Sequence, residues 1–381
     1  MHLPGLSGVG RVASKVVFAS LLTCAAARAD VTTVDGVGAP IVRIQLPTQA
    51  NLTIRTWDRR QVQIDGDSTG FTVSKRAQFV PALLPAQFIR AGQTNGPNGP
   101  IVLPAESFVV TTLTPGLHAV VLIKGEAGHP LGPITVTIPS GTQLVWANVG
   151  RGSLVLQNYQ NGTFILHLNN GTALVDAVSG DGFVQVLHGP LFAADSNFDR
   201  LRARTAVGNQ VYEHCNVKQI ESSVVNGSIV YDDGHFDQGL ARFDVTSGSV
   251  ALGAASAAQL NAHVAGGRVT TLFDGRVSVD ARDTEATAMV LGGGPIVTAT
   301  SGNGSVLLYD GSLRNKGRIP TEWQPARRVL RRENNVFPQG VPPADKQPNP
   351  PQQRLPNRPV PRQSRPSQPR PKGAGRVVHF R

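Results

Sequence analysis

Apolar and polar residues alternate in short segments throughout residues 141–317, and turn residues separate one segment from the next. In one such segment Phe164, Leu166 and Leu168 lie two positions apart. A period of two is typical of a β-strand with one buried face. No long helical periodicity competes with it, although residues 251–262 are rich in alanine. The pattern predicts an all-β protein.

The glycines between these segments recur with a regular spacing. The interval from Gly152 to Gly171 and that from Gly227 to Gly248 are both about 20 residues, a length typical of solenoid repeats. Several glycines follow Asn or Asp, as in Asp181-Gly182, and such pairs tolerate positive φ and mark tight reversals. We therefore expect a unit of about 20 residues that contains two strands and two turns.

Two architectures could use such strands, namely antiparallel hairpins in a sandwich or coils stacked into a solenoid. A regular period with small residues at every corner favours stacked coils. One coil buries too few apolar side chains to fold alone, so its neighbours must add burial and accept its backbone hydrogen bonds. The sequence thus predicts a parallel β-helix, or β-solenoid, of about 20 residues per coil.

Changes in composition divide the chain into four segments. We expect a signal peptide at 1–29, an N-terminal β cap region at 30–140, β-solenoid repeats at 141–317 and a basic Pro-rich tail at 318–381. The cap region contains a Pro/Gly-rich insertion and is expected to cover the open strand edge of the first coil. Residues 296–324 are expected to close the other end.

The first thirty residues have the features of an export signal. Arg11 and Lys15 precede a short apolar run, and Ala27 and Ala29 supply small residues for cleavage before Asp30. The run is shorter than the roughly 20 residues that span a bilayer. We expect an exported protein in the periplasm, on the cell surface or outside the cell; a retained anchor and a lipoprotein modified at a cysteine are the alternatives.

Charge is segregated along the chain. Residues 318–381 carry 14 Lys and Arg against 3 acidic residues, a net charge of +11, whereas residues 30–317 carry 19 against 22, or −3. The tail also holds 14 of the 28 prolines, a composition that predicts disorder. Its charge suits cell-wall polymer, lipopolysaccharide or an anionic membrane surface. Nucleic acid is not expected, because the chain is exported and lacks interleaved aromatics; a purely solubilising tail is the alternative.

One acidic cluster stands out as candidate chemistry. The segment YDDGHFDQG contains Asp232, Asp233, His235 and Asp237, which could hold a divalent cation or resemble the carboxylates of glycan-cleaving enzymes. Charged residues at a turn are also ordinary solvated corner chemistry. We predict no catalytic residue, no cofactor and no established metal site, with these four residues as the weak metal candidates.

The cysteine content adds little chemistry. Cys215 is the sole thiol of the chain after Asp30, and a lone cysteine of this kind is typically a small buried apolar residue. His214 precedes it, but adjacent residues of a strand point to opposite faces. A Cys–His catalytic pair is therefore not expected.

Two stretches are similar to a known family. The segments TIRTWDRRQVQIDGD, from Thr53 to Asp67, and ITVTIPSGTQLVWANVGRGSLVLQNYQNG, from Ile134 to Gly162, resemble the DUF4097-type adhesin-like family. The resemblance implies a right-handed parallel β-helix-like domain on exported or surface bacterial proteins. It implies no established chemistry.

These observations predict a non-enzymatic, adhesin-like β-solenoid that serves as a binding or structural module of the cell envelope. The alternative is a polysaccharide lyase or hydrolase, for which Asp232, Asp233, Asp237 and Arg242 would have to converge on one groove. A spacer without a ligand is a third possibility.

Overall fold

The computed structural model describes a large part of the chain, namely residues 30–35, 40–66, 68–80, 83–85, 94–96, 99–101, 107–109, 113–237, 239–273 and 277–311. All of these belong to one compact unit, residues 1–331. The predicted signal peptide and the predicted basic tail lie outside the described residues.

The described part of the chain is built from β-strands, as the alternating pattern predicted. Twenty strands form one mixed sheet. Two small sheets pair β5 (Leu83–Pro85) with β8 (Ser107–Val109) and β6 (Thr94–Gly96) with β7 (Gly99–Ile101). The other regular element among these residues is a short 3-10 turn, Ser68–Gly70. The all-β prediction is confirmed.

Ten strands follow one another through the repeats: β11 (Leu144–Gln157), β12 (Gly162–Asp176), β13 (Ser179–His188), β14 (Leu191–Ala194), β15 (Asn197–Val207), β16 (Gln210–Glu213), β17 (Asn216–Asn226), β18 (Ile229–Phe236), β19 (Ala241–Ser247) and β20 (Val250–Ala254). From β13 onward, each repeat has a first strand (β13, β15, β17, β19) and a second strand (β14, β16, β18, β20). Strands β11 and β12 are longer, and each forms both the first and the second strand of its repeat. Accordingly, β11 pairs with β12 along its whole length, and β12 pairs first with β13 and then with β14.

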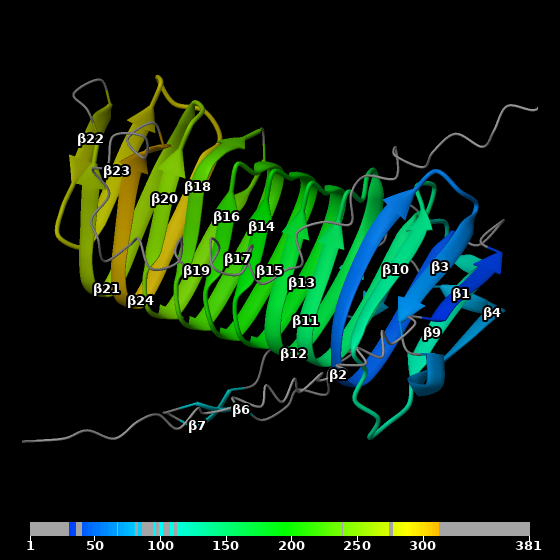
Figure 1. The fold of residues 1–381 in the computed structure, drawn as a ribbon. Helices are drawn as coiled ribbons and strands as arrows, with labels where there is room; N and C mark the ends of the chain where they lie inside the picture. Colours follow the sequence, from blue (N-terminus) through cyan, green and yellow to red (C-terminus); the bar gives the residue numbers. More distant parts are fainter. Residues whose placement is uncertain are drawn as a thin grey trace, which may run out of the picture. The chain divides into compact units, whose positions relative to one another are not determined.

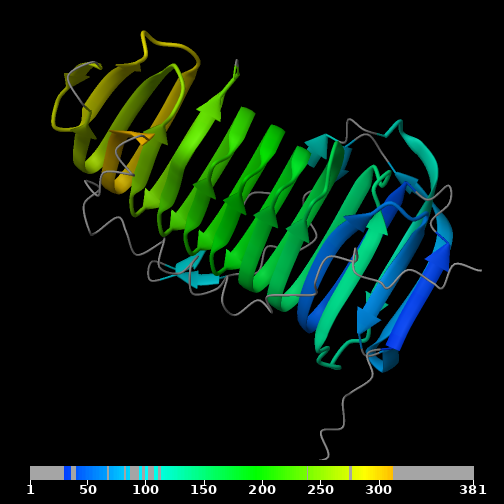
Figure 2. The same ribbon diagram turned by 45° about the horizontal axis from the view of Figure 1, so that its top comes forward.

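Each repeat pairs in parallel with the next one. Leu191 of β14 lies opposite Gln210 of β16. Gln210 in turn lies opposite Ile229 of β18, and Ile229 lies opposite Val250 of β20. In Figures 1 and 2 these strands lie side by side in sequence order. Successive repeats therefore place equivalent residues next to each other.

A column of glycines makes the reversal between first and second strand. The φ angles of its members lie between +118° and +145°. These members are Gly152, Gly171, Gly189, Gly208, Gly227 and Gly248. A Cβ atom on Gly208 would overlap the carbonyl oxygen of Gly189, and the same overlap recurs along the column. We call this reversal the glycine corner. Its stacking explains the spacing that is visible in the sequence.

The opposite reversal, from a second strand to the next first strand, uses other residue types. It is formed by residues with φ between +47° and +56°, namely Asn158, Ala177, Asp195, His214 and Asp233. The amide of Asp195 donates to the carbonyl of Glu213, and the amide of His214 donates to that of Asp232, at 3.0 and 3.1 Å. We call this reversal the left-handed corner. Its residues are exposed or half-buried.

The inward faces of the strands form one continuous core. Phe164, Leu166 and Leu168 are fully buried in it, as their alternation predicted. The core also encloses the amide of Gln210, whose Nε2 donates to Thr205 Oγ1 and to the carbonyl of Ser223, both at 3.0 Å. The Tyr212 hydroxyl donates to Gln210 Oε1 at 2.8 Å. These bonds offset the cost of burying the amide.

At the N-terminal end of the sheet, a strand from early in the chain lies inside the parallel order. Strand β2 (Ile41–Trp57) pairs in parallel with β11 on one side and with β9 (Gly116–Gly125) and β10 (Pro133–Pro139) on the other. Antiparallel strands then follow: β3 (Gln61–Gly66) on β10, β1 (Asp30–Asp35) on β3, and β4 (Phe71–Val80) on β9. Figure 1 shows this arrangement, with β1 to β4 in blue and β9 and β10 in cyan-green.

The C-terminal end has the same arrangement, with a strand from elsewhere in the chain inserted into the parallel order. Strand β24 (Ile296–Asp310) lies in parallel between β19 and β20 on one side and β21 (Ala258–Leu272) on the other. Strands β23 (Glu285–Val290) and β22 (Ser278–Ala281) then continue in antiparallel order.

The expectation that residues 296–324 close this end is wrong for the residues that the structure describes. Strand β24 lies between β20 and β21, so that β21, β23 and β22 come after it at this end. The physical reason is the glycine corner: Gly304 stacks on Gly248, and Gly267 stacks on Gly304. The column thus continues through β24 before it reaches β21.

Candidate functional site

The acidic segment singled out by the sequence does not form one cluster. Asp232 lies on β18 and is 2% exposed, Asp233 occupies the left-handed corner, and His235 and Asp237 are exposed. Among the residues that the structure describes, no group of three or more His, Cys, Asp or Glu side chains is placed to hold a metal ion. Asp232, Asp233 and His235 thus lie on β18, Asp237 directly follows it, and the four are not gathered into one site.

Asp233 instead belongs to a stack that crosses three repeats. His214 Nε2 lies 3.1 Å from Asp233 Oδ2, and His214 Nδ1 lies 3.4 Å from Asp195 Oδ1. All three side chains are more than a third exposed. Further along the same edge, burial and the charge of Asp195 raise the pKa of Asp176. Pairs this exposed contribute about 1 kcal/mol or less each.

For the enzymatic alternative, Asp232 and Asp233 lie on β18, whereas Arg242 lies on β19 (Ala241–Ser247). Arg242 Nε lies 2.5 Å from Asp244 Oδ2 of its own strand. Among the contacts between described residues, none joins Arg242 to Asp232, Asp233 or Asp237.

Cys215 is a buried core residue, as predicted. It is fully buried, and its thiol lies 3.5 Å from the carbonyl oxygens of Ala193 and Glu213. Burial raises the pKa of the Cys215 thiol to about 12, so the thiol is protonated near neutral pH and is a weak nucleophile. The neighbouring His214 side chain is about half exposed and pairs with carboxylates instead.

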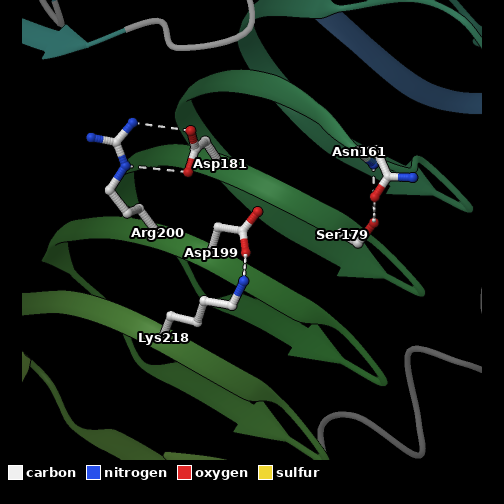
Figure 3. Close-up of polar contacts among 6 residues, drawn as sticks. All are labelled: Asn161, Ser179, Asp181, Asp199, Arg200 and Lys218. Carbon is white, nitrogen blue, oxygen red and sulfur yellow. Dashed lines mark hydrogen bonds and ion pairs between the residues drawn. The ribbon is translucent and has the colours of Figure 1, made fainter. Parts of the chain in front are cut away.

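The first strands carry a second set of charged residues that pair from one repeat to the next. Figure 3 shows Arg200 of β15 reaching Asp181 of β13, with hydrogen bonds of 3.2 and 3.0 Å to the two carboxylate oxygens. In the same view Lys218 of β17 lies 2.6 Å from Asp199 of β15. Asn161 and Ser179 form an uncharged contact between neighbouring repeats, in which the backbone N–H of Asn161 donates to Ser179 Oγ at 3.0 Å.

These pairs continue along the sheet and hold the charges in place. Arg202 Nε donates to Glu221 Oε2 at 2.9 Å. The hydrogen bond to Asp181 raises the pKa of Arg200, and the hydrogen bond to Asp199 raises that of Lys218. We call this surface, made by Asp181, Asp199, Arg200, Arg202, Lys218 and Glu221, the charged face. In it each of the three cations pairs with a carboxylate of the neighbouring repeat.

Sequence reasoning missed the charged face, although a signal for it exists. In DRLRAR, residues 199–204, the arginines alternate with Leu201 and Ala203, which are buried. That alternation places the arginines on the outer face of a strand. Their partners could not be read from the sequence, because the pairing depends on the register between repeats, which shifts between Gly180 and Asp181.

The described residues include no helix with the length and apolar character needed to cross a membrane.

Comparison with known proteins gives little to place the chain. No family model matches it, and no curated protein matches it. Among solved structures, the chain is similar to a proposed cell adhesion protein from Clostridium sporogenes, with 8% identity, a TM-score of 0.27, and coverage of 74% of this chain and 98% of the other. A TM-score this low does not establish a shared fold. The resemblance to the DUF4097-type family thus stays a prediction.

Proposed function

We propose that this protein is an exported, non-enzymatic module of the bacterial cell envelope. In this proposal its β repeats form an adhesin-like binding or structural body, and its basic tail attaches that body to anionic envelope polymers. The observation that carries the proposal is the register of the repeats, which brings equivalent residues together from one repeat to the next.

The proposed body is a β-solenoid of about 20 residues per coil. Two features support this interpretation: the parallel pairing of each repeat with the next, and the two corners that recur in every repeat. Stacking of this kind lets each repeat supply the burial that its neighbour lacks. It also produces long columns of side chains on the outer surface.

Such columns suit an extended partner with its own repeating groups. The charged face offers positive and negative side chains that are already held by their neighbours. A preorganised array loses little side-chain entropy on binding. We therefore propose a polymeric ligand, such as a cell-wall glycan, for the body.

The tail has a different proposed role. Residues 338–381 carry nine Lys and Arg against Asp345, a net charge of +8. A cationic segment of this kind is attracted to anionic surfaces, and salt weakens the attraction. We propose that it contacts cell-wall polymer, lipopolysaccharide or anionic lipid.

Binding assays across a salt series test the attachment. The chain from Asp30 to Arg381 would be compared with a chain that ends at Phe337 and with a full chain whose nine distal cations are replaced by Gln. Each would be incubated with purified sacculi, lipopolysaccharide, and vesicles with or without anionic lipid. We expect the unmodified chain to bind lipopolysaccharide and anionic vesicles at low salt and to dissociate as salt rises, and the two altered chains to lose this binding. On sacculi the altered chains should lose the salt-dependent part of the binding and keep the part that the body contributes.

Equal binding by all three chains, or binding that salt does not change, would show that the tail is not the attachment element. The assay also separates the possible targets. Binding to anionic but not neutral vesicles indicates that the tail recognises the charge of the lipid, and binding to sacculi, which contain no lipid, indicates cell-wall polymer. Cleavage of the sacculi by the unmodified chain during the incubation would disprove the non-enzymatic part of the proposal.

A further inference from the structure

The second strands carry a continuous apolar column on their outer surface. It has one residue per repeat, and the paired strands place these residues in contact in the order Val155, Leu174, Phe192, Val211, Val230, Ala251 and Leu307. We call it the outer column. It runs from β11 to β24.

Alternation along each strand shows that the column faces away from the core. Leu191 and Ala193, on either side of Phe192, belong to the core cluster, as do Ile229 on one side of Val230 and Tyr231 on the other. Successive residues of a strand point to opposite faces. Phe192 and Val230 therefore point outward.

Despite this direction, the outer column is buried. Phe192 is 3% exposed, Val230 is 7% exposed and Leu307 is 1% exposed. An outward-facing side chain of a sheet is in contact with water unless another layer covers it. Part of the protein therefore covers the outer column.

The surroundings of the column restrict the chemistry of its cover. Residues two positions further along each strand share its face, and there they include Asp176, Glu213 and Asp232. Asp195 and Asp233 follow at the left-handed corner. A segment that lies over this surface should combine apolar side chains with positive charge.

The chain that follows β24 has this composition. Residues 318–337, RIPTEWQPARRVLRRENNVF, carry five arginines against two glutamates, interleaved with Ile319, Trp323, Val329 and Leu330. The segment starts 11 residues after Leu307, the C-terminal end of the column. The column spans six strand spacings, about 29 Å. The 26 residues from 312 to 337 can extend to about 85 Å. Reach is therefore sufficient.

We propose that residues 318–337 bind the outer column of the same chain, with the apolar side chains over Phe192 and its neighbours and the arginines beside the acidic edge. Residues 338–381 then remain for contact with other molecules. The proposal does not depend on the function proposed above.

Hydroxyl-radical footprinting of the chain from Asp30 to Arg381 tests it, because the method reports the solvent access of individual side chains. The test variant is Val329→Asp with Leu330→Asp, which places two charges in the segment and leaves the body unchanged. The matched control is Val377→Asp with Val378→Asp, an equivalent apolar pair further along the tail. Phe243, which is fully buried and faces inward, reports the integrity of the core.

We expect oxidation of Phe192 to rise roughly fivefold or more in the test variant, because removal of its cover exposes an outward-facing ring. It should stay at the unmodified level in the control variant, and Phe243 should stay protected in both. Unchanged oxidation of Phe192 in the test variant would overturn the proposal and assign the cover to another part of the chain. A rise at Phe192 that is matched at Phe243 would overturn it as well, because displacing a surface segment leaves the core closed.

Discussion

The two reversals in each repeat perform the same geometric task under different constraints. At the glycine corner, the carbonyl oxygen of one glycine occupies the place that a Cβ on the next glycine would need. At the left-handed corner, Asn158, Ala177, His214 and other residue types adopt φ near +50°. One corner is therefore closed by the neighbouring backbone, whereas the other is open to solvent and to sequence variation.

This difference separates what holds the repeats together from what they can display. The glycine corner sets the approach of successive repeats, so its residue type is restricted. The left-handed corner requires only a backbone conformation that Asn and Asp adopt readily and that costs other residues about 1–2 kcal/mol. Its side chains can therefore carry charge, as Asp195, His214 and Asp233 do.

The largest effect is expected from Gly208→Ala in the middle of the glycine corner. The added Cβ would overlap the Gly189 carbonyl and would force a φ of +145° on alanine. We expect a loss of more than about 3 kcal/mol in the free energy of unfolding, measured by urea titration. A loss below about 1 kcal/mol would mean that the corner can open and would contradict the contrast between the two reversals.

A smaller effect, of about 3 kcal/mol, is expected on acidification, through His167. This side chain is fully buried, and burial lowers its pKa to about 4, against the opposing effect of its hydrogen bond with Gln185. In the unfolded chain the His167 imidazole binds a proton near pH 6.5, whereas in the folded protein it does so only near pH 4. The stability that the neutral imidazole contributes is therefore fully present above pH 6.5 and is lost as the pH falls toward 4.

Urea titrations at several pH values would measure this loss, with His167→Gln as the control. The variant should lose less stability than the unmodified chain between pH 6.5 and 4. Parallel curves for the two proteins would mean that His167 does not contribute. The result also sharpens the comparison, since His167 is enclosed whereas His214 is at the open corner.

At the left-handed corner, Ala177→Gly should stabilise the protein by about 1 kcal/mol. Glycine adopts a φ of +53° without the strain that alanine has there. The increase in the urea midpoint of unfolding measures the effect. A decrease comparable to that of Gly208→Ala would show that both corners depend on their side chains in the same way.

The smallest effect is expected from His214→Asn, within about 0.5 kcal/mol at neutral pH. Asparagine accepts the left-handed conformation, and the lost contacts with Asp195 and Asp233 are exposed. Thermal unfolding of the variant beside the unmodified chain measures the difference. A large loss would mean that the carboxylate–histidine stack holds the repeats together.

The sequence was sufficient to predict the strands and one of the two corners. The regular interval from Gly152 to Gly171 and the alternation in Phe164, Leu166 and Leu168 were visible because they reflect local backbone and burial requirements. The prediction of a turn at Asp181-Gly182 was wrong. Gly182 lies within β13, where the absence of a Cβ leaves room for the ring of Phe164.

Features that depend on long-range order could not be predicted in this way. The insertion of β2 and β24 into the parallel order joins segments about 100 and 56 residues apart in the chain. The partners of Arg200 and Lys218 require the register between repeats to be known. The acidic segment at Asp232 was conspicuous in sequence, yet the strand that carries it sends its side chains in different directions.

The in-register stacking of the repeats is tested most directly by a distance between the two ends of the left-handed corner. Spin labels at Asn158→Cys and Asp233→Cys are far apart in the chain but only four repeats apart, so pulsed dipolar spectroscopy should give a narrow distribution near about 19 Å. Both positions are at the open corner, and native Cys215 is buried and should not react. A broad distribution, or one centred beyond about 30 Å, would contradict the stacking.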